Sequence, residues 1–395
     1  MYVGERVVLI GDGMKRLKEG YRMAGVKKLY KESGNSSQCG YIFGHMFGAI
    51  GILAGTSAKW FCVPLFMNLQ DGVKTIFNWN KKSQPQDRQA SHVVQMIEHG
   101  FAATKEFGKS LLLLDRYFLS VPAFERLNEL NSLGETHMDI ITQSKSNAVA
   151  YERPAKSETT QRGRPRKKGE TIKLKELQHT RAAKFQTTTV MIYGKSETVQ
   201  FLCLNLLWGQ KLYQELRFVL VLLKGRLTIL VSTDLELDPV EIIRLYSYRF
   251  KIESTFREMN QVIGAFGYHF WSKAMPKLKR YLKKDEPHPL EQVTNKEARK
   301  RIQLSVKAIE GFVMCSCIAM GMLQLIALRF SNRVPGFFLR FLRTLSKAIV
   351  SEATVTTYLC KSIFRMFAKN PRLIITQIIR SKQERVTLDN YFFDF

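Results

Sequence analysis

The sequence has little that would build a metal finger, a secretion signal or a disulfide framework. Its six cysteines, among 395 residues, form no C-x2-C pair and no Cys/His finger spacing, which argues against a zinc site and favours reduced thiols in a cytosolic compartment. The N-terminal apolar run covers only residues 7–10 before an acid follows, too short for a signal peptide. Acidic residues are also scarce, with 34 Asp and Glu against 61 Lys and Arg.

The resulting net charge of +27 predicts a polyanionic partner, with nucleic acid ahead of an anionic membrane surface. The apolar share of 45% and the charged share of 24% are those of a globular protein of two to three domains. The run 311–328 carries no charge and reaches the length of a membrane span. Because it contains two cysteines, a serine, a glycine and a glutamine, we expect a buried core helix and no membrane partner.

Apolar runs and their periodicity predict a mixed α/β fold. A first group of strand-like runs lies at 6–12, 41–54, 59–69, 110–115 and 138–142, and a second group at 187–193, 198–207, 216–223 and 227–232. Helical spacing marks 91–107, 122–130 and 238–262. This order predicts one α/β core into which the second group of strands is inserted.

The domain organisation follows from shifts in composition. Residues 152–184 hold eleven Lys and Arg against four Glu and are broken by Gly and Pro, which predicts a mobile, solvated loop. We expect four segments: 1–145 as the first part of the core, 146–235 as the basic loop with the β-rich insertion, 236–330 as the helical part of the core with a second basic stretch, and 331–395 as a C-terminal helical region.

Three acidic residues are candidates for a shared site. Asp12 and Asp115 each end a short apolar run, and in α/β folds the carboxyl ends of strands are where ligands collect. The alternative is that each Asp only caps the next turn. In the segment 246–260, Arg249, Glu253 and Arg257 recur every four residues and would share one helical face. The alternative there is a solvated Arg–Glu–Arg ladder.

Taken together in so basic a chain, the three carboxylates predict metal-dependent phosphodiester chemistry. Two divalent ions can activate a water or a 3′-hydroxyl and stabilise the leaving oxygen. Oxygen ligands suit Mg²⁺, with Mn²⁺ able to substitute. Arg249 and Arg257 would then supply positive charge beside the scissile phosphate.

At these residues the chain resembles the DDE transposases of bacterial insertion sequences, in the branch with a Y-x2-R-x3-E-x6-K signature. Tyr246, Arg249 and Glu253 match that spacing, whereas Asn260 stands at the position of the lysine. The segments IGDG at 10–13 and LLLLDR at 111–116 resemble the family's two Asp sites. The resemblance implies an RNase H-like mixed sheet flanked by helices, with a strand-rich insertion between the second Asp and the Glu.

The resemblance also implies roles for individual residues. Asp12, Asp115 and Glu253 would be the catalytic and metal-binding triad. Tyr246 and Arg249 would hold DNA phosphates beside the cut, with Asn260 doing so less strongly because it lacks the charge. Relatives often carry a Trp on the insertion that stacks a displaced base, and Trp208 is the candidate here, an ordinary strand-end aromatic being the alternative.

Recognition of the element ends is where the chain departs from the family. Such transposases carry a DNA-binding helical region before the first Asp, whereas eleven residues precede Asp12. We expect either a truncated product or a transfer of this role to the basic stretches 152–184 and 273–301. The motif GRPR at 163–166 resembles a minor-groove AT-hook, although non-specific phosphate contact is the simpler interpretation. The candidate DNA contacts there are Arg164, Arg166, Lys279 and Arg280.

The expected function is therefore that of a Mg²⁺-dependent DNA transposase, which hydrolyses a phosphodiester at the element end and joins the 3′-hydroxyl to target DNA. Its partners would be double-stranded DNA of the element ends and of the target, bound by a homodimer. Its location would be cytoplasmic and nucleoid-associated. Two alternatives stay open: a DNA-binding remnant that does not transpose, and a nuclease on the same core.

Overall fold

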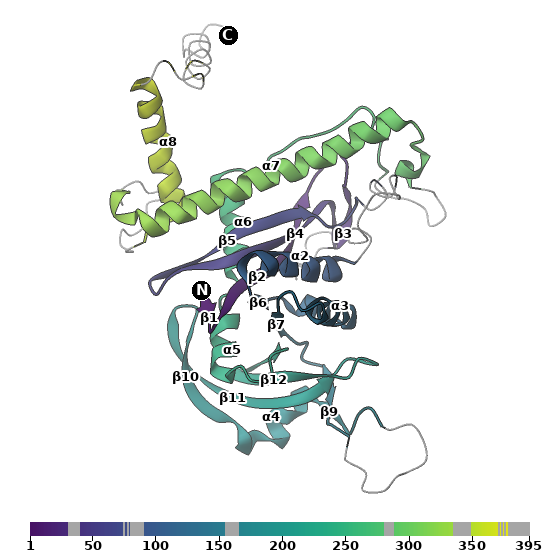
Figure 1. Cartoon of the computed structure of the whole chain (residues 1–395), viewed down its shortest axis with the longest axis vertical. Helices are drawn as coiled ribbons and strands as arrows, with labels where there is room; N and C mark the ends of the chain where they lie inside the picture. Colours follow the sequence, from purple (N-terminus) through teal and green to yellow (C-terminus); the bar gives the residue numbers. More distant parts are fainter. Residues whose placement is uncertain are drawn as a thin grey trace. The chain divides into compact units, whose positions relative to one another are not determined.

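The computed structural model describes residues 1–30, 40–73, 91–154, 166–279, 288–334 and 349–369, with single positions at 76, 79, 372, 374 and 377 (Figure 1). The chain divides into two compact units. The first contains Met1–Gly55 and Trp60–Ala319, and the second contains Thr56–Lys59 and Met320–Phe395.

The first unit is built on a mixed β-sheet, whose central strands run in the order β3-β4-β2-β6-β7. Strands β2, β6 and β7 are parallel neighbours, and β4 is antiparallel to β2. β5 pairs with the other edge of β4, and the short β1 pairs with β2. The bounds are β1 Tyr2–Val3, β2 Arg6–Leu17, β3 Lys27–Tyr30, β4 Tyr41–Thr56, β5 Lys59–Leu69, β6 Ser110–Leu113 and β7 Met138–Gln143.

Helices cover both faces of this sheet. α2 (His92–Phe107) packs on β2, β6 and β7 and against α3 (Val121–Ser132), while α5 (Pro239–Tyr246) packs on β7 and α6 (Lys251–Val262) packs on β2. β6 consists of Ser110 and three leucines, and every side chain is buried, as expected for a parallel strand covered on both sides. The predicted α/β class is confirmed: this is an RNase H-like mixed sheet flanked by helices.

The strand-rich insertion is also present between the second Asp and the Glu. Its last strand, β13, pairs antiparallel with β7 and so continues the central sheet. The strands are β8 Val149–Tyr151, β9 Thr171–Lys173, β10 Gln186–Ile192, β11 Lys195–Trp208, β12 Gln214–Leu223 and β13 Arg226–Ser232. The four runs predicted at 187–232 correspond to β10–β13.

The expectation of a solvated loop over 152–184 is wrong for its second half. β9 pairs with β8, and a short helix, α4 (Leu177–Thr180), follows it. Leu174 and Leu177 are buried in the hydrophobic core. Charge density concealed this structure because two leucines suffice to anchor a short segment whose other side chains remain in water. Residues 155–165 lie outside the described residues.

The segment around Asp12 shows why its glycines are needed. A Cβ on Gly11 would lie 2.7 Å from Leu114 Cδ2, and one on Gly13 would lie 2.8 Å from Nε2 of His92, which belongs to α2. Since side chains alternate across a strand, both glycines face α2 and Asp12 faces the opposite side. The close approach of α2 therefore requires the glycines, and the acid between them projects toward α6.

The long helix α7 (Lys296–Arg329) is buried on one face and exposed on the other. Val313, Cys317 and Ala327 are buried, while Ile318 and Met322 are exposed. The expectation of a buried core helix over 311–328 therefore holds for one face only. Among the described residues, α7 is the one helix long and apolar enough to span a membrane, and 33% of its most apolar 18-residue stretch is buried. In the second unit, Gln324 donates to Glu352 on α8 (Glu352–Lys369), over 3.3 Å.

Candidate active site

The register of two parallel strands places Asp12 and Asp115 at the same level. Ile10 on β2 is opposite Leu113 on β6, so Asp12 and Asp115 each stand two residues beyond that last pair. Equal offset means that both side chains point to the same face of the sheet. Because neighbouring strands are about 4.8 Å apart, the two carboxylates are neighbours at this edge.

The two acids are held in different ways. Asp12 is not the last residue of its strand, as the sequence suggests, because β2 continues to Leu17 through pairing with β4. Its Oδ1 accepts from the Gly13 amide over 2.7 Å. Asp115 follows β6 and caps the 3-10 helix η2 (Arg116–Phe118), accepting from the Arg116 amide. The capping role that the sequence leaves open is therefore real for Asp115, and it still leaves the carboxylate at the sheet edge.

Glu253 comes to the same place from the opposing helix layer. The helix predicted over 238–262 is interrupted, because α5 ends at Tyr246 and α6 begins at Lys251. Arg249 lies in the turn between them and points into the sheet. Its Nη1 is 3.0 Å from Oδ2 of Asp12, and its Nη2 contacts Oε1 of Glu253. Arg249 thereby connects the first and third acids.

Burial and charge set the electrostatics of this cluster. The side chain of Asp12 is 16% exposed and that of Arg249 is 15% exposed, whereas that of Glu253 is 55% exposed. Burial raises the pKa of Asp12 to about 6, against the lowering effect of Arg249 and the Gly13 amide, and the charges of Asp115 and Glu253 raise it further. Burial lowers the pKa of Arg249, but Asp12 and Glu253 outweigh this and leave it raised. The charges of Asp115 and Glu253 therefore both act on Asp12.

Tyr246 closes the site on the side of β7. Its hydroxyl donates to Oε1 of Gln143, the last residue of β7, over 3.4 Å. Burial raises the pKa of this phenol, as do the charges of Asp115 and Asp12, while Arg249 opposes the effect. Tyr246 is thus a neutral hydroxyl beside the acids, which can donate a hydrogen bond.

The position of Asn260 shows a residue that the sequence interpretation missed. Asn260 accepts a hydrogen bond from Arg16 on β2, and the guanidinium of Arg16 also lies 5.3 Å from the ring centroid of Phe266. Arg16 is four residues beyond Asp12, so the alternation of the strand places both on the same face. The spacing of Asp12 and Arg16 is visible in the sequence, but it has a meaning only when β2 is known to extend past Asp12.

The remaining predicted residues that the structure describes have other contacts or lie on the surface. Arg257 is exposed and pairs with Glu258 over 3.3 Å, so it does not share the Asp12 site. Trp208 ends β11 and packs against Phe124 with centroids 5.5 Å apart, at the edge of the hydrophobic core, which favours the structural alternative for this residue. Arg166 and Lys279 are exposed. Arg164 and Arg280 lie outside the described residues.

The donor chemistry of the cluster suits a hard divalent cation, because its three acids offer carboxylate oxygens. Within the part of the chain that the structure describes, however, no three His, Cys, Asp or Glu side chains stand close enough together to hold one metal ion. The guanidinium of Arg249 instead supplies positive charge between Asp12 and Glu253. The acids thus fit a cation by type, and here they are arranged around an arginine.

Comparison with known protein families finds a match. The family described as transposase DDE domain matches residues 75–270, a range that contains Asp115, Tyr246, Arg249 and Glu253 and begins after Asp12. No curated protein and no solved structure is significantly similar to the chain. Members of this family act on DNA and generally use divalent metal ions. From the sheet order and this match, the chain belongs to the DDE transposases of the RNase H-like superfamily.

Proposed function

We propose that the chain is a DNA transposase that hydrolyses a phosphodiester at the ends of its element and transfers the freed 3′ end into target DNA. The observation that carries the proposal is the placement of Asp12 and Asp115 at one level on neighbouring parallel strands, with Glu253 joined to Asp12 through Arg249. Two acids on neighbouring strands and a third joined to one of them through an arginine support metal-dependent chemistry on DNA, in a chain of net charge +27.

In this proposal Asp12, Asp115 and Glu253 hold Mg²⁺, for which Mn²⁺ can substitute. When bound, the divalent ions activate the attacking oxygen and stabilise the leaving one. The positions of Asp12 on β2 and of Asp115 at the start of η2 set the geometry, while Glu253, on the exposed surface of α6, can adjust its side chain. The pKa of Asp12 is raised to about 6. An adjacent cation would favour the ionised form of this carboxyl and so lower that pKa.

Arg249 can pair either with the carboxylates of the site or with a DNA phosphate. In the structure its guanidinium is held by two carboxylates, and a DNA phosphate offers the same bidentate geometry. We propose that Arg249 contacts the phosphate beside the cut when DNA is bound, which releases the acids. The neutral hydroxyl of Tyr246, next to it, would donate to the same phosphate.

Arg16 supplies the positive charge that Asn260 lacks. A lysine in the signature would bring one cation to this end of α6, and here Arg16 reaches the same position from β2 and bonds to Asn260. We propose that Arg16 and Asn260 together contact a further phosphate of the DNA strand. Replacing Arg16 by Gln should weaken DNA binding and reduce its salt dependence by about one phosphate contact.

The test uses labelled duplex DNA that carries the sequences flanking the gene, incubated with Mg²⁺ or Mn²⁺. The wild type is compared with Glu253→Gln and with Glu258→Gln, a matched control on the same helix. We expect nicking at the element ends by the wild type and by Glu258→Gln, loss of nicking in Glu253→Gln, and intact DNA binding in all three. A supercoiled plasmid in the same reaction captures strand transfer as joined label.

The outcomes separate the alternatives. Nicking without joining would indicate a nuclease on the same core. Binding without metal-dependent nicking in any variant would indicate a DNA-binding remnant. Nicking that persists in Glu253→Gln would refute the triad.

The proposed assembly is a homodimer on double-stranded DNA, because two element ends must be cut. It would act in the cytoplasm at the nucleoid and without a membrane partner. Light scattering of the protein with and without an element-end duplex measures the mass of the complex. A complex that contains one chain for each pair of ends would contradict the dimer.

A further inference from the structure

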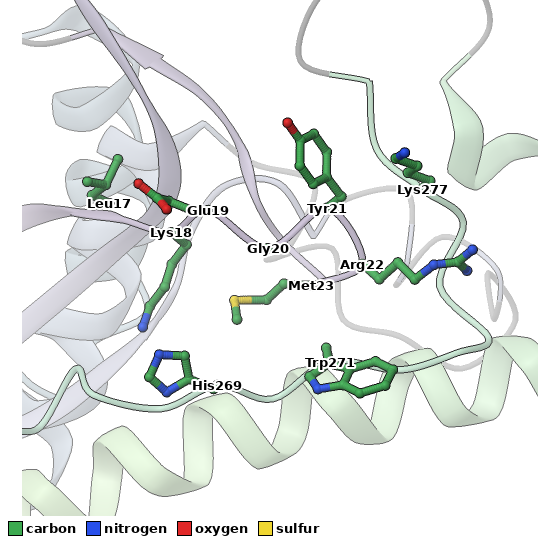
Figure 2. Close-up of a pocket in the computed structure, with 10 residues that line it drawn as sticks. All are labelled: Leu17, Lys18, Glu19, Gly20, Tyr21, Arg22, Met23, His269, Trp271 and Lys277. Atoms are coloured by element: carbon green, nitrogen blue, oxygen red, sulfur yellow. The ribbon is translucent and has the colours of Figure 1, made fainter.

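A hollow of about 800 Å³ lies beyond the acidic cluster, where β2 ends. It is lined by residues 17–23 on one side and by residues 269, 271 and 277 on the other, and we call it the β2-loop pocket. Figure 2 shows Tyr21 and Trp271 coming from the two segments, with the cationic ends of Arg22 and Lys277 to one side of them. Its volume is that of a typical small-ligand site.

Hydrogen bonds between the two segments hold the pocket in shape. The Ser272 amide donates to the carbonyl of Arg22 over 3.3 Å, and the Leu278 amide donates to that of Tyr21 over 2.7 Å. The Arg22 guanidinium donates to the carbonyls of Lys273 and Met275 over 3.2 and 2.8 Å. The walls are therefore ordered before any ligand arrives, which reduces the entropic cost of binding.

The buried end of the pocket is fixed by Lys18. Its ammonium donates to the carbonyls of Phe266 and Tyr268 over 2.7 and 2.8 Å and lies 3.7 Å from the ring centroid of Tyr268. Lys18 is thus a structural cation that joins the end of β2 to the segment after α6. It leaves the mouth of the pocket to the other side chains.

The mouth combines exposed aromatic rings with positive charge. Trp271 is 61% exposed and Tyr21 is 44% exposed, and the ammonium of Lys277 lies 5.5 Å from the ring centroid of Tyr21. Arg22 adds a second positive charge, and Glu19 is the one acidic residue in the lining. Exposed indole and phenol rings beside cations match a ligand that has a flat ring and a phosphate, which is a nucleotide.

The position of the pocket relates it to the proposed cut. Asp12, Arg16 and Lys18 lie on the same face of β2 and its continuation, and the pocket begins at Leu17, about 17 Å from Asp12 at 3.3 Å per residue. That distance corresponds to about five base pairs of B-DNA at 3.4 Å each. Arg16 lies between the two sites and marks a path for the phosphate backbone.

We propose that the β2-loop pocket binds an unpaired nucleotide of the DNA substrate, with the base stacked on Trp271 and its phosphate beside Lys277 and Arg22. The inference rests on the proposed action on DNA and adds a site for single-stranded DNA that is separate from the acids. Stacking on an aromatic side chain accepts any base, so the pocket would follow strand separation rather than sequence.

The test measures equilibrium binding of a fluorescein-labelled 12-nucleotide single strand and of a duplex of the same length to the full chain. We expect Trp271→Ala to weaken single-strand binding roughly tenfold, since stacking on one base contributes about 1–3 kcal/mol. Trp271→Phe should retain most of the affinity, and duplex binding should change less than twofold. Tyr2→Ala, at an aromatic residue that is 71% exposed outside the pocket, is the matched control.

A second variant addresses the phosphate. Lys277→Gln should lower the slope of log affinity against log salt for the single strand by about 0.7, the value for one contact. Unchanged single-strand affinity in Trp271→Ala, in a wild type that cuts DNA in a Glu253-dependent manner, would overturn the pocket and leave the proposed function standing. Trp271-dependent binding by a wild type that does not cut would support the pocket and refute the enzyme.

Discussion

Replacing Asp12 by Asn should make the protein more stable while abolishing its activity. Asp12 is buried with its charge only partly compensated, and its pKa is raised from an ordinary 3.8 to about 6. At 1.36 kcal/mol for each pH unit, this difference corresponds to about 3 kcal/mol by which the ionised carboxylate destabilises the folded state. Asn has the shape of the protonated acid and carries no charge, so it removes this cost at neutral pH.

The stability gained by Asp12→Asn should depend on pH. The pKa of Asp12 in the folded state is above its value in the unfolded state. Protonation of Asp12 therefore stabilises the fold, and this contribution is fully present below about pH 3.8 and is lost as the pH rises through about 6. The advantage of Asp12→Asn should therefore be largest above pH 7 and should shrink as the pH falls toward 4.

The assay is urea unfolding of the wild type and of Asp12→Asn at pH 7.5 and pH 4.5, followed by circular dichroism. Glu253→Gln is the control, since its carboxylate is 55% exposed and stays hydrated, so that its loss should change stability far less. Both variants should fail to nick DNA. A destabilised Asp12→Asn at pH 7.5 would contradict this prediction, because it would mean that pairing with Arg249 exceeds the cost of burial.

Two further predictions concern the scaffold around the site. Arg6→Met should lower the free energy of unfolding by about 2 kcal/mol, because the Arg6 guanidinium pairs with Asp139 and Asp234 over 3.1 and 2.6 Å; unfolding measured at pH 7 checks this, and an unchanged midpoint would contradict it. Gly13→Val should destabilise the fold by about 1–3 kcal/mol, because its Cβ would lie 2.8 Å from Nε2 of His92; a thermal melt at or above that of the wild type would show that α2 can shift to make room.

Much of the fold was predictable because its signals are local. The apolar run before Asp12, the leucines of β6 and the apolar run of β12 each bury their side chains in the way their composition indicates. The spacing of Tyr246, Arg249 and Glu253 likewise marked the segment that carries the third acid. Short stretches of sequence were sufficient here because hydrophobic periodicity is set by neighbouring residues.

The strands, the acids and the excess of positive charge can be recognised in the sequence, whereas the way they combine depends on contacts between distant segments. The level placement of Asp12 and Asp115 depends on the register between β2 and β6, which involves residues more than a hundred positions apart. The break after Tyr246 turned Arg249 toward Asp12, and the extension of β2 brought Arg16 to Asn260. The β2-loop pocket likewise depends on tertiary structure. Its side chains come from two segments far apart in the sequence, and only long-range pairing brings such segments together.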